Sequence, residues 1–141
     1  MIVVADASVA LKWFLSGSLA EDHTETALSI FEAAVLGRIQ LLQPVHFIAE
    51  VAAVLARVKP TEAQSDLIDL IAIERRTVES PEVYARAVAL ATQINHHLFD
   101  TLYHALALET PSAVFVTADR RYFDKAQHLG QIAWLPEFVV A

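Results

Sequence analysis

Short apolar runs alternate along this chain with longer segments whose apolar residues recur at helical spacing. The runs predicted to be strands cover residues 2–5, 39–42, 77–79, 113–117 and 132–134. Strands that alternate with helices form parallel sheets, because each connecting helix packs back on the sheet and covers one face. The sequence therefore predicts an α/β fold, with a short central parallel sheet of about five strands flanked by helices.

Caps and apolar stripes place the helices between these strands. Asp22 and Glu25 have the spacing of a capping box before a helix predicted over residues 24–36. Ser80 followed by Pro81 predicts another helix start, because proline suits the first helical position. Three helices carry stripes predicted to pack on the sheet, formed by Phe47, Ile48, Val51, Val54, Leu55 and Val58, by Val83, Tyr84, Ala87, Val88, Ala91 and Ile94, and by Phe99, Leu102, Tyr103 and Leu106.

The length of 141 residues suits one ordinary domain, and with only 3 glycines and 5 prolines the chain shows no linker. We therefore expect a single domain over residues 1–141. No apolar stretch reaches the ~20 residues needed to span a bilayer, and no basic leader precedes the first strand. Cysteine is absent, which excludes a zinc–thiolate site and a thiol nucleophile. These features predict a cytoplasmic protein without a membrane partner.

Four acidic residues lie where an α/β chain has little structural reason to place them. Asp6 and Asp119 each follow an apolar strand, and Glu50 and Asp100 lie in apolar helical segments. A carboxylate among apolar neighbours is costly unless it is paired or binds a metal. Ligands of parallel sheets bind beyond the carboxyl ends of the strands, where Asp6 and Asp119 lie. The pattern predicts an acidic cluster that holds a hard divalent cation.

Each of these acids also has a purely structural interpretation. Asp6 and Asp119 occupy positions typical of helix N-caps. Asp100 could be a first-turn acid that the helix dipole favours. Glu50 and Arg57 lie seven residues apart on nearly the same line of a helix, so a boundary ion pair is open for Glu50. Capping and metal binding are compatible, and the sequence leaves both open.

At these residues the sequence resembles the PIN-domain ribonucleases, in particular the VapC-type toxins of bacterial toxin–antitoxin pairs. The resemblance covers essentially the whole chain and implies a five-stranded parallel sheet. The segments that carry it, in order, are Val4–Val9, Pro44 with Glu50–Leu55, Phe99–Ala107, and Val116–Asp119 with Phe123. It implies a cluster of acids that holds Mg²⁺ or Mn²⁺, formed by Asp6, Glu50, Asp100 and Asp119.

The resemblance also implies supporting residues around this cluster. Ser8 and Thr117 match hydroxyl positions that support the acids, and Asp124 matches an occasional extra acid. One position departs from the family pattern: where an Asn often follows the helix glutamate by three residues, this chain has Ala53. That departure leaves the acids intact and removes a polar contact expected near Glu50.

The function that the resemblance implies is an endoribonuclease that hydrolyses RNA with a metal-activated water and leaves 5′-phosphate and 3′-hydroxyl ends. It further implies the toxin of a type II toxin–antitoxin system, which forms a homodimer and binds a VapB-type antitoxin. Two alternatives remain open: a catalytically silent PIN-like binding module, and a PIN nuclease of RNA processing without an antitoxin. A phosphoaspartyl enzyme of the haloacid-dehalogenase type is disfavoured, because Ser8 stands where its second Asp is expected.

The formal net charge of −7 argues at first against a nucleic-acid partner. The objection weakens if carboxylates converge on a metal, because a bound cation can invert the local potential. Arg120, Arg121 and Lys125 follow Asp119 and are candidate contacts for an RNA backbone, with a solvated basic face as the alternative. The six histidines show no metal-ligand spacing, and we expect them at surface or boundary positions.

Overall fold

Five parallel strands and the helices between them make up the computed structural model, which describes residues 1–15 and 22–141. In chain order the elements are β1 (Ile2–Ala5), α1 (Ala7–Phe14), α2 (Thr24–Val35), β2 (Gln40–Gln43), α3 (Phe47–Val58), α4 (Ala63–Ala72), β3 (Arg76–Thr77), α5 (Pro81–Gln93), α6 (Leu98–Leu108), β4 (Ala113–Thr117), α7 (Arg120–Ala126), the 3₁₀ helix η1 (Gln127–Leu129), β5 (Ile132–Trp134) and the 3₁₀ helix η2 (Leu135–Glu137).

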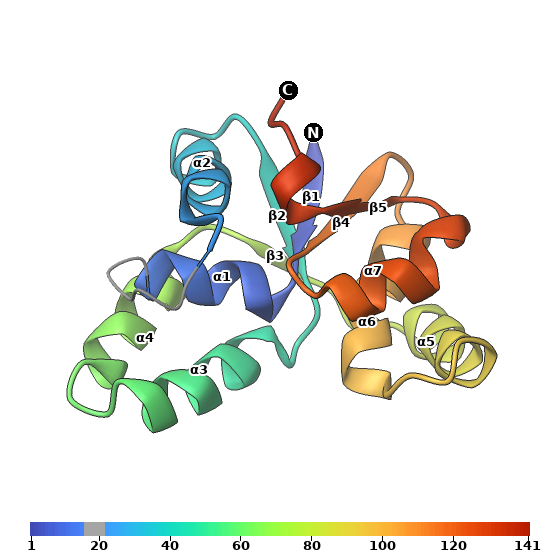
Figure 1. Cartoon of the computed structure of the whole chain (residues 1–141), viewed down its shortest axis with the longest axis horizontal. Coiled ribbons are helices and arrows are strands. Elements are labelled where there is room, and N and C mark those ends of the chain that lie inside the picture. Colours follow the sequence, from blue (N-terminus) through green and yellow to red (C-terminus); the bar gives the residue numbers. More distant parts are fainter. Residues whose placement is uncertain (16–21) are drawn as a thin grey trace.

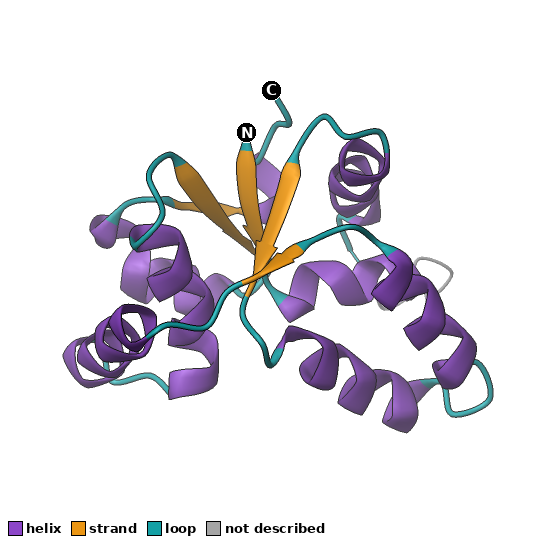
Figure 2. Cartoon of the chain, turned by 180° about the vertical axis from the view of Figure 1, so that it is seen from behind, coloured by secondary structure: helices purple, strands orange, loops and turns teal. Residues whose placement is uncertain are grey.

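The sheet has the order β3-β2-β1-β4-β5, and every pairing is parallel. Helices α1 to α4 cover one side of the sheet and α5 to α7 the other (Figures 1 and 2). The predicted α/β fold with a five-stranded parallel sheet is therefore confirmed. From β1 the chain proceeds to β2 and β3 on one side and later to β4 and β5 on the other. This reversal makes the carboxyl ends of β1 and β4 the place where such sheets bind ligands.

The core forms where the apolar runs and stripes meet. Val3, Val4 and Ala5 of β1 are fully buried, because helices cover both faces of the central strand. Four stripe residues are exposed instead of lying in the core: Val58, Tyr84, Val88 and Phe99, with Val88 at 55% and Phe99 at 58%. In α5 the buried residues are Val83, Ala87 and Leu90. The spacing of apolar residues in α5 allowed either of two overlapping faces to be buried. Packing against α6 buries the face with Val83, Ala87 and Leu90.

The two predicted helix caps have opposite outcomes. Ser80 caps α5 as predicted, and its hydroxyl accepts a hydrogen bond from the Val83 N–H at 3.2 Å. The capping box predicted at Asp22 and Glu25 is wrong. His23 occupies the N-cap of α2 in the left-handed conformation and makes no side-chain cap bond. The helix begins at Thr24 as predicted, but its N-cap is one residue later than the predicted Asp22.

The side chain of Gln43 fixes the carboxyl end of β1. Backbone pairing between β1 and β2 registers Ile2 with Gln40 and Val3 with Leu41. Beyond it, the Ala5 N–H donates to Gln43 Oε1 at 2.7 Å, and Gln43 Nε2 donates to the Ala5 carbonyl at 2.8 Å. A side chain thus replaces a backbone partner, which separates the two strands at their carboxyl ends.

No helix in the described ranges 1–15 and 22–141 combines the length and apolar character that a bilayer crossing requires.

We predict that Gln43→Leu destabilises the fold. The substitution leaves the buried N–H and C=O of Ala5 without partners, and each such group costs about 1–3 kcal/mol. Urea denaturation followed by circular dichroism would measure the loss in the free energy of unfolding. Gln40→Ala on the exposed start of the same strand is the control, with an expected change within about 0.5 kcal/mol. Equal stability of Gln43→Leu and the wild type would contradict the role assigned to Gln43.

Candidate active site

Three of the four predicted acids lie close enough to influence one another electrostatically. Asp6 follows β1, Glu50 lies in the first turn of α3 and Asp100 in the first turn of α6. The negative charges of Asp100 and Glu50 both raise the pKa of the Asp6 carboxyl. Side chains more than forty residues apart in sequence therefore converge beyond the carboxyl end of the central strand.

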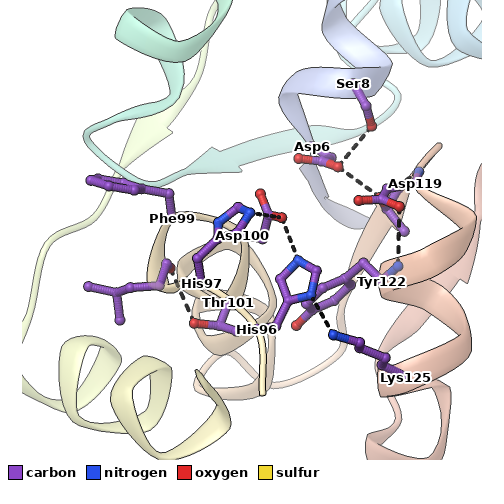
Figure 3. Close-up of polar contacts among 12 residues, drawn as sticks. Asp6, Ser8, His96, His97, Phe99, Asp100, Thr101, Asp119, Tyr122 and Lys125 are labelled. Carbon is purple, nitrogen blue, oxygen red and sulfur yellow. Dashed lines mark hydrogen bonds and ion pairs between the residues drawn. The ribbon is translucent and has the colours of Figure 1, made fainter. Parts of the chain in front are cut away.

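Asp6 is the buried member of this group, with 8% of its surface exposed. The Ser8 hydroxyl donates to Asp6 Oδ2 at 2.8 Å, and the Thr117 hydroxyl donates to the same oxygen at 2.7 Å (Figure 3). Burial is the main cause that raises the Asp6 pKa to about 7, and the two hydroxyl bonds only partly oppose it. Because both hydroxyls bind Oδ2, the other carboxylate oxygen receives no hydrogen bond within the part of the chain that the structure describes.

Asp6 and Asp119 differ in their capping roles. Asp6 occupies the N-cap position of α1, but its side chain makes no cap bond. Asp119 caps α7 through its side chain, since Asp119 Oδ1 accepts from the Tyr122 N–H at 3.2 Å. The Asp119 N–H also donates to the Thr117 hydroxyl at 3.0 Å. Thr117 thus links the Asp6 side chain to the Asp119 backbone.

Glu50 is held by aromatic residues rather than by Arg57. The Tyr103 hydroxyl donates to Glu50 Oε1 at 2.6 Å, and His46 Nε2 lies 3.1 Å from the same oxygen. Burial and the neighbouring carboxylates, Glu50 foremost, raise the pKa of the Tyr103 hydroxyl far above its usual value, so it remains a donor. Ala53, which stands where the family pattern often has an Asn, is exposed on α3. The orientation of Glu50 therefore comes from α6 and from the turn before α3.

Two adjacent histidines bind Asp100. His96 Nε2 lies 2.6 Å from Asp100 Oδ2, and His97 Nε2 lies 3.3 Å from it. Their rings stack at 4.8 Å between centroids, because both residues precede α6 instead of lying in a helix, where they would point 100° apart. One donor atom from each of the three side chains lies within 4.8 Å of the others, a spacing that a metal ion could bridge.

The expected surface or boundary position is wrong for His104, which is fully buried. Its Nε2 lies 2.8 Å from the Gly130 carbonyl, which can only accept, so Nδ1 accepts from the Tyr122 hydroxyl at 3.0 Å. Burial lowers the pKa of His104 and keeps the ring neutral. The bonds connect α6 with α7 and with the loop before β5. They hold the helix that Asp119 caps.

The basic residues of α7 divide into two groups. Arg120 is bound on its own helix by Asp124 at 2.9 Å, and its guanidinium lies 4.3 Å from the ring centroid of Trp134. Asp124 is thereby paired at the surface, where its side chain is half exposed. Arg121 and Lys125 line a separate hollow beside His96. Of the three predicted phosphate contacts, these two remain available to a ligand.

The clustered side chains offer carboxylate oxygens, the ligands that Mg²⁺ prefers. Asp6, Glu50 and Asp100 supply them, and Asp119 adjoins the group through Thr117. Ser8 and Thr117, the predicted supporting hydroxyls, both lie in hydrogen-bond contact with Asp6.

Sequence reasoning missed several residues that shape this site. For His96 and His97 the sequence did offer an indication, because the apolar stripe of the preceding helix ends near Asn95. In the structure Asn95 has a φ of 51°, and both rings lie in the turn that follows it. No pattern marked Gln43, His46 or the hydroxyl of Tyr103, because their partners lie far away in sequence.

A search of protein-family models matches residues 3–129 to the PIN domain. The match spans all four acids and extends from β1 to the end of η1. A search of curated proteins gives no match.

Solved structures with the same fold include three bacterial complexes. A toxin–antitoxin complex from Klebsiella pneumoniae aligns with a TM-score of 0.69 at 16% identity, over 96% of this chain and 99% of that chain. VapBC-1 from nontypeable Haemophilus influenzae aligns at 0.65 and 14% identity, over 97% and 100%. VapBC2 from Rickettsia felis, bound to a DNA fragment from its promoter, aligns at 0.62 and 14% identity, over 95% and 97%. At such identities the likeness concerns the fold.

The raised pKa of Asp6 predicts how stability depends on pH without metal. The folded state keeps a proton that the unfolded state loses between the ordinary pKa of 3.8 and about 7. The free energy of unfolding should therefore fall as pH rises across this range. Above about pH 7 the full destabilisation caused by the ionised Asp6 should be present. Asp6→Asn cannot ionise, so its stability should depend less on pH and exceed that of the wild type at pH 8.

Urea unfolding in EDTA at several pH values between 5 and 8 would measure this difference. Asp69→Asn, at an exposed position of α4, is the matched control and should retain the wild-type slope. If Asp6→Asn and the wild type lose stability in parallel as pH rises, Asp6 is not the group responsible.

Proposed function

The chain belongs to the PIN domain family, and from this membership and the arrangement of its acids we propose that it is a metal-dependent endoribonuclease. PIN domains are typically nucleases. The observation that carries the proposal is the convergence of Asp6, Glu50 and Asp100, whose charges influence one another at the ligand-binding edge of the sheet. A catalytically silent binding module would not need these costly carboxylates.

The donor set fits Mg²⁺ or Mn²⁺. Carboxylate oxygens are hard ligands, and a few of them suffice because Mg²⁺ usually retains several waters. Asp6 would bind through the oxygen that Ser8 and Thr117 leave free. Such a cation would supply polarisation of a phosphodiester oxygen and a bound water of lowered pKa. Its positive charge would also offset the burial of the Asp6 carboxylate and the neighbouring negative charges, which together raise the Asp6 pKa.

The surrounding side chains would position these acids for the reaction. Tyr103 donates to one oxygen of Glu50, and His96 binds one oxygen of Asp100. Thr101, next to Asp100, donates to the Ala87 carbonyl at 2.9 Å and fixes the start of α6 on α5 (Figure 3). Each acid thus has one oxygen oriented by the protein, which limits rearrangement when a ligand binds.

We further propose that the protein is the toxin of a type II toxin–antitoxin system. Similar folds occur in the VapBC complexes of Haemophilus influenzae and Rickettsia felis. A hollow of about 650 Å³ among α1, α2 and α4 offers an apolar surface to a VapB-type antitoxin segment, with Trp13, Phe14, Leu28, Phe31 and Val35 among its lining residues. A basic side chain of that antitoxin would pair with the clustered acids, where charge-assisted bonds are strong.

The metal mechanism predicts that Asp100→Asn binds RNA in Mg²⁺ but loses cleavage by a factor on the order of 10² or more. The loss falls on cleavage because the metal acts mainly on charge that develops in the transition state. Cleavage of a labelled RNA and its binding would be measured on the same preparations. Asp124→Asn, whose carboxylate pairs with Arg120 at the surface, is the control.

Chelation should silence the wild type, and expression should be toxic for the wild type but tolerated for Asp100→Asn. Cleavage that persists in excess EDTA would exclude the metal mechanism. Equal toxicity of the two proteins would show that growth arrest comes from binding alone.

We also propose a homodimer formed through α5, where Tyr84 and Val88 leave apolar surface exposed. Val88→Asp should shift the sedimentation of the purified protein from dimer to monomer at micromolar concentration, because a buried unpaired carboxylate is costly. The control is Ile68→Asp on α4, an exposed position on the opposite side of the sheet (Figure 1). A wild type that sediments as a monomer throughout this range would contradict the dimer.

A further inference from the structure

A hollow of about 360 Å³ lies beside the two histidines that contact Asp100, and none of the described residues that line it is acidic. Its walls come from the turn before α6 and from α7, and consist of Asn95, His96, His97, Arg121 and Lys125. This concentration of basic and neutral donors contrasts with the formal net charge of −7 for the whole chain. An anion would therefore find local attraction here that most of the surface does not offer.

Arg121 is exposed and forms no hydrogen bond or ion pair with any residue in the described ranges. Neighbouring Arg120, in contrast, is bound by Asp124 and lies over Trp134. A guanidinium has five N–H donors in a fork that matches phosphate oxygens. At Arg121 the protein leaves all of them to solvent or to a ligand.

Lys125 lies one helical turn from Arg121 and is held at the hollow by two contacts. Its ammonium donates to the Asn95 carbonyl at 2.9 Å and lies 3.3 Å from His96 Nδ1. Because an ammonium has three donors, one is left for a ligand. The cation is thus positioned by the turn before α6 and is not fully neutralised by it.

The ring of His96 separates this hollow from the acids. Lys125 can only donate, so His96 Nδ1 accepts, and the Nε2 proton is directed to Asp100. Figure 3 shows the ring between Asp100 on one side and Lys125 on the other. One phosphate cannot contact both the acid cluster and the ammonium, because an imidazole lies between them.

We propose that this hollow binds the RNA backbone phosphate next to the phosphodiester that is cut. The inference rests on the proposed nuclease function, which places the reacting phosphate at the acids. A strand that continues past His96 brings its neighbouring phosphate to Arg121 and Lys125, whose charged donors suit phosphate oxygens. Such backbone contacts fix the register of a strand without reading its sequence. The hollow therefore positions substrate and leaves base selection to other surfaces.

The test combines neutral phosphates with the removal of Arg121. A single-stranded RNA series with one methylphosphonate linkage at each position in turn is bound to the Asp6→Asn protein in Mg²⁺, which keeps the strand uncut. One linkage should weaken binding by about 10-fold when neutralised, as expected for a lost charge-assisted bond. In Asp6→Asn/Arg121→Ala, neutralising that same linkage should have no further effect.

The matched control is Arg38→Ala, which removes the same charge before β2, at the opposite end of the sheet from the acids. It should leave the linkage effect intact. With the cleaving protein, Arg121→Ala should raise KM for long RNA and leave a dinucleotide with a single phosphodiester unaffected.

If Arg121→Ala and Arg38→Ala weaken binding equally and every linkage keeps its effect, the hollow does not bind a phosphate. A slower cleavage of the dinucleotide by Arg121→Ala would likewise overturn the assignment to a neighbouring phosphate. A wild type that cuts no RNA while the linkage effect persists would remove the nuclease function and retain the hollow as a phosphate site.

Discussion

A carboxylate buried at the end of a central strand destabilises a fold unless other groups compensate its charge, and at Asp6 two hydroxyls do so only in part. The rest of the ligand-binding edge depends on this group. Thr117 binds Asp6 from β4 and also receives the N–H of Asp119, so the ends of two adjacent strands are fixed together. Gln43 closes the other flank of β1 by bonding Ala5. The edge is thus held by polar bonds around an acid whose charge the protein compensates only in part.

The charges of the site are separated rather than mixed. The acids converge beyond β1, while Arg121 and Lys125 lie past the ring of His96. Mixed charges would neutralise one another and leave neither a cation site nor a phosphate site. If the proposed cation binds, it and the basic hollow would together reverse the unfavourable net charge along the proposed path of an RNA strand. The overall charge of −7 therefore says little about this particular surface.

Local patterns predicted the parts of the fold that depend on local physics. The apolar runs became strands, although β3 covers Arg76–Thr77 instead of the predicted 77–79 and is exposed. Ser80 became a cap, and Asp6 followed the central strand as expected. Predictions that required a choice between two packable faces fared worse, as exposed Val88 and Phe99 show. Burial of a polar residue was also hidden from the sequence, because buried His104 needs partners on α7 and beyond it.

The site divides in the same way. An acid after an apolar strand is visible in sequence, because its cost is set by its immediate neighbours. The orientation of Glu50 is not visible, because the donor comes from Tyr103, fifty-three residues away. Family resemblance agreed with the four acids chosen from their apolar surroundings, and it pointed to a missing polar contact at Ala53, which is exposed. Glu50 accepts its hydrogen bond from Tyr103 instead, so the loss of one supporting residue does not imply loss of the site.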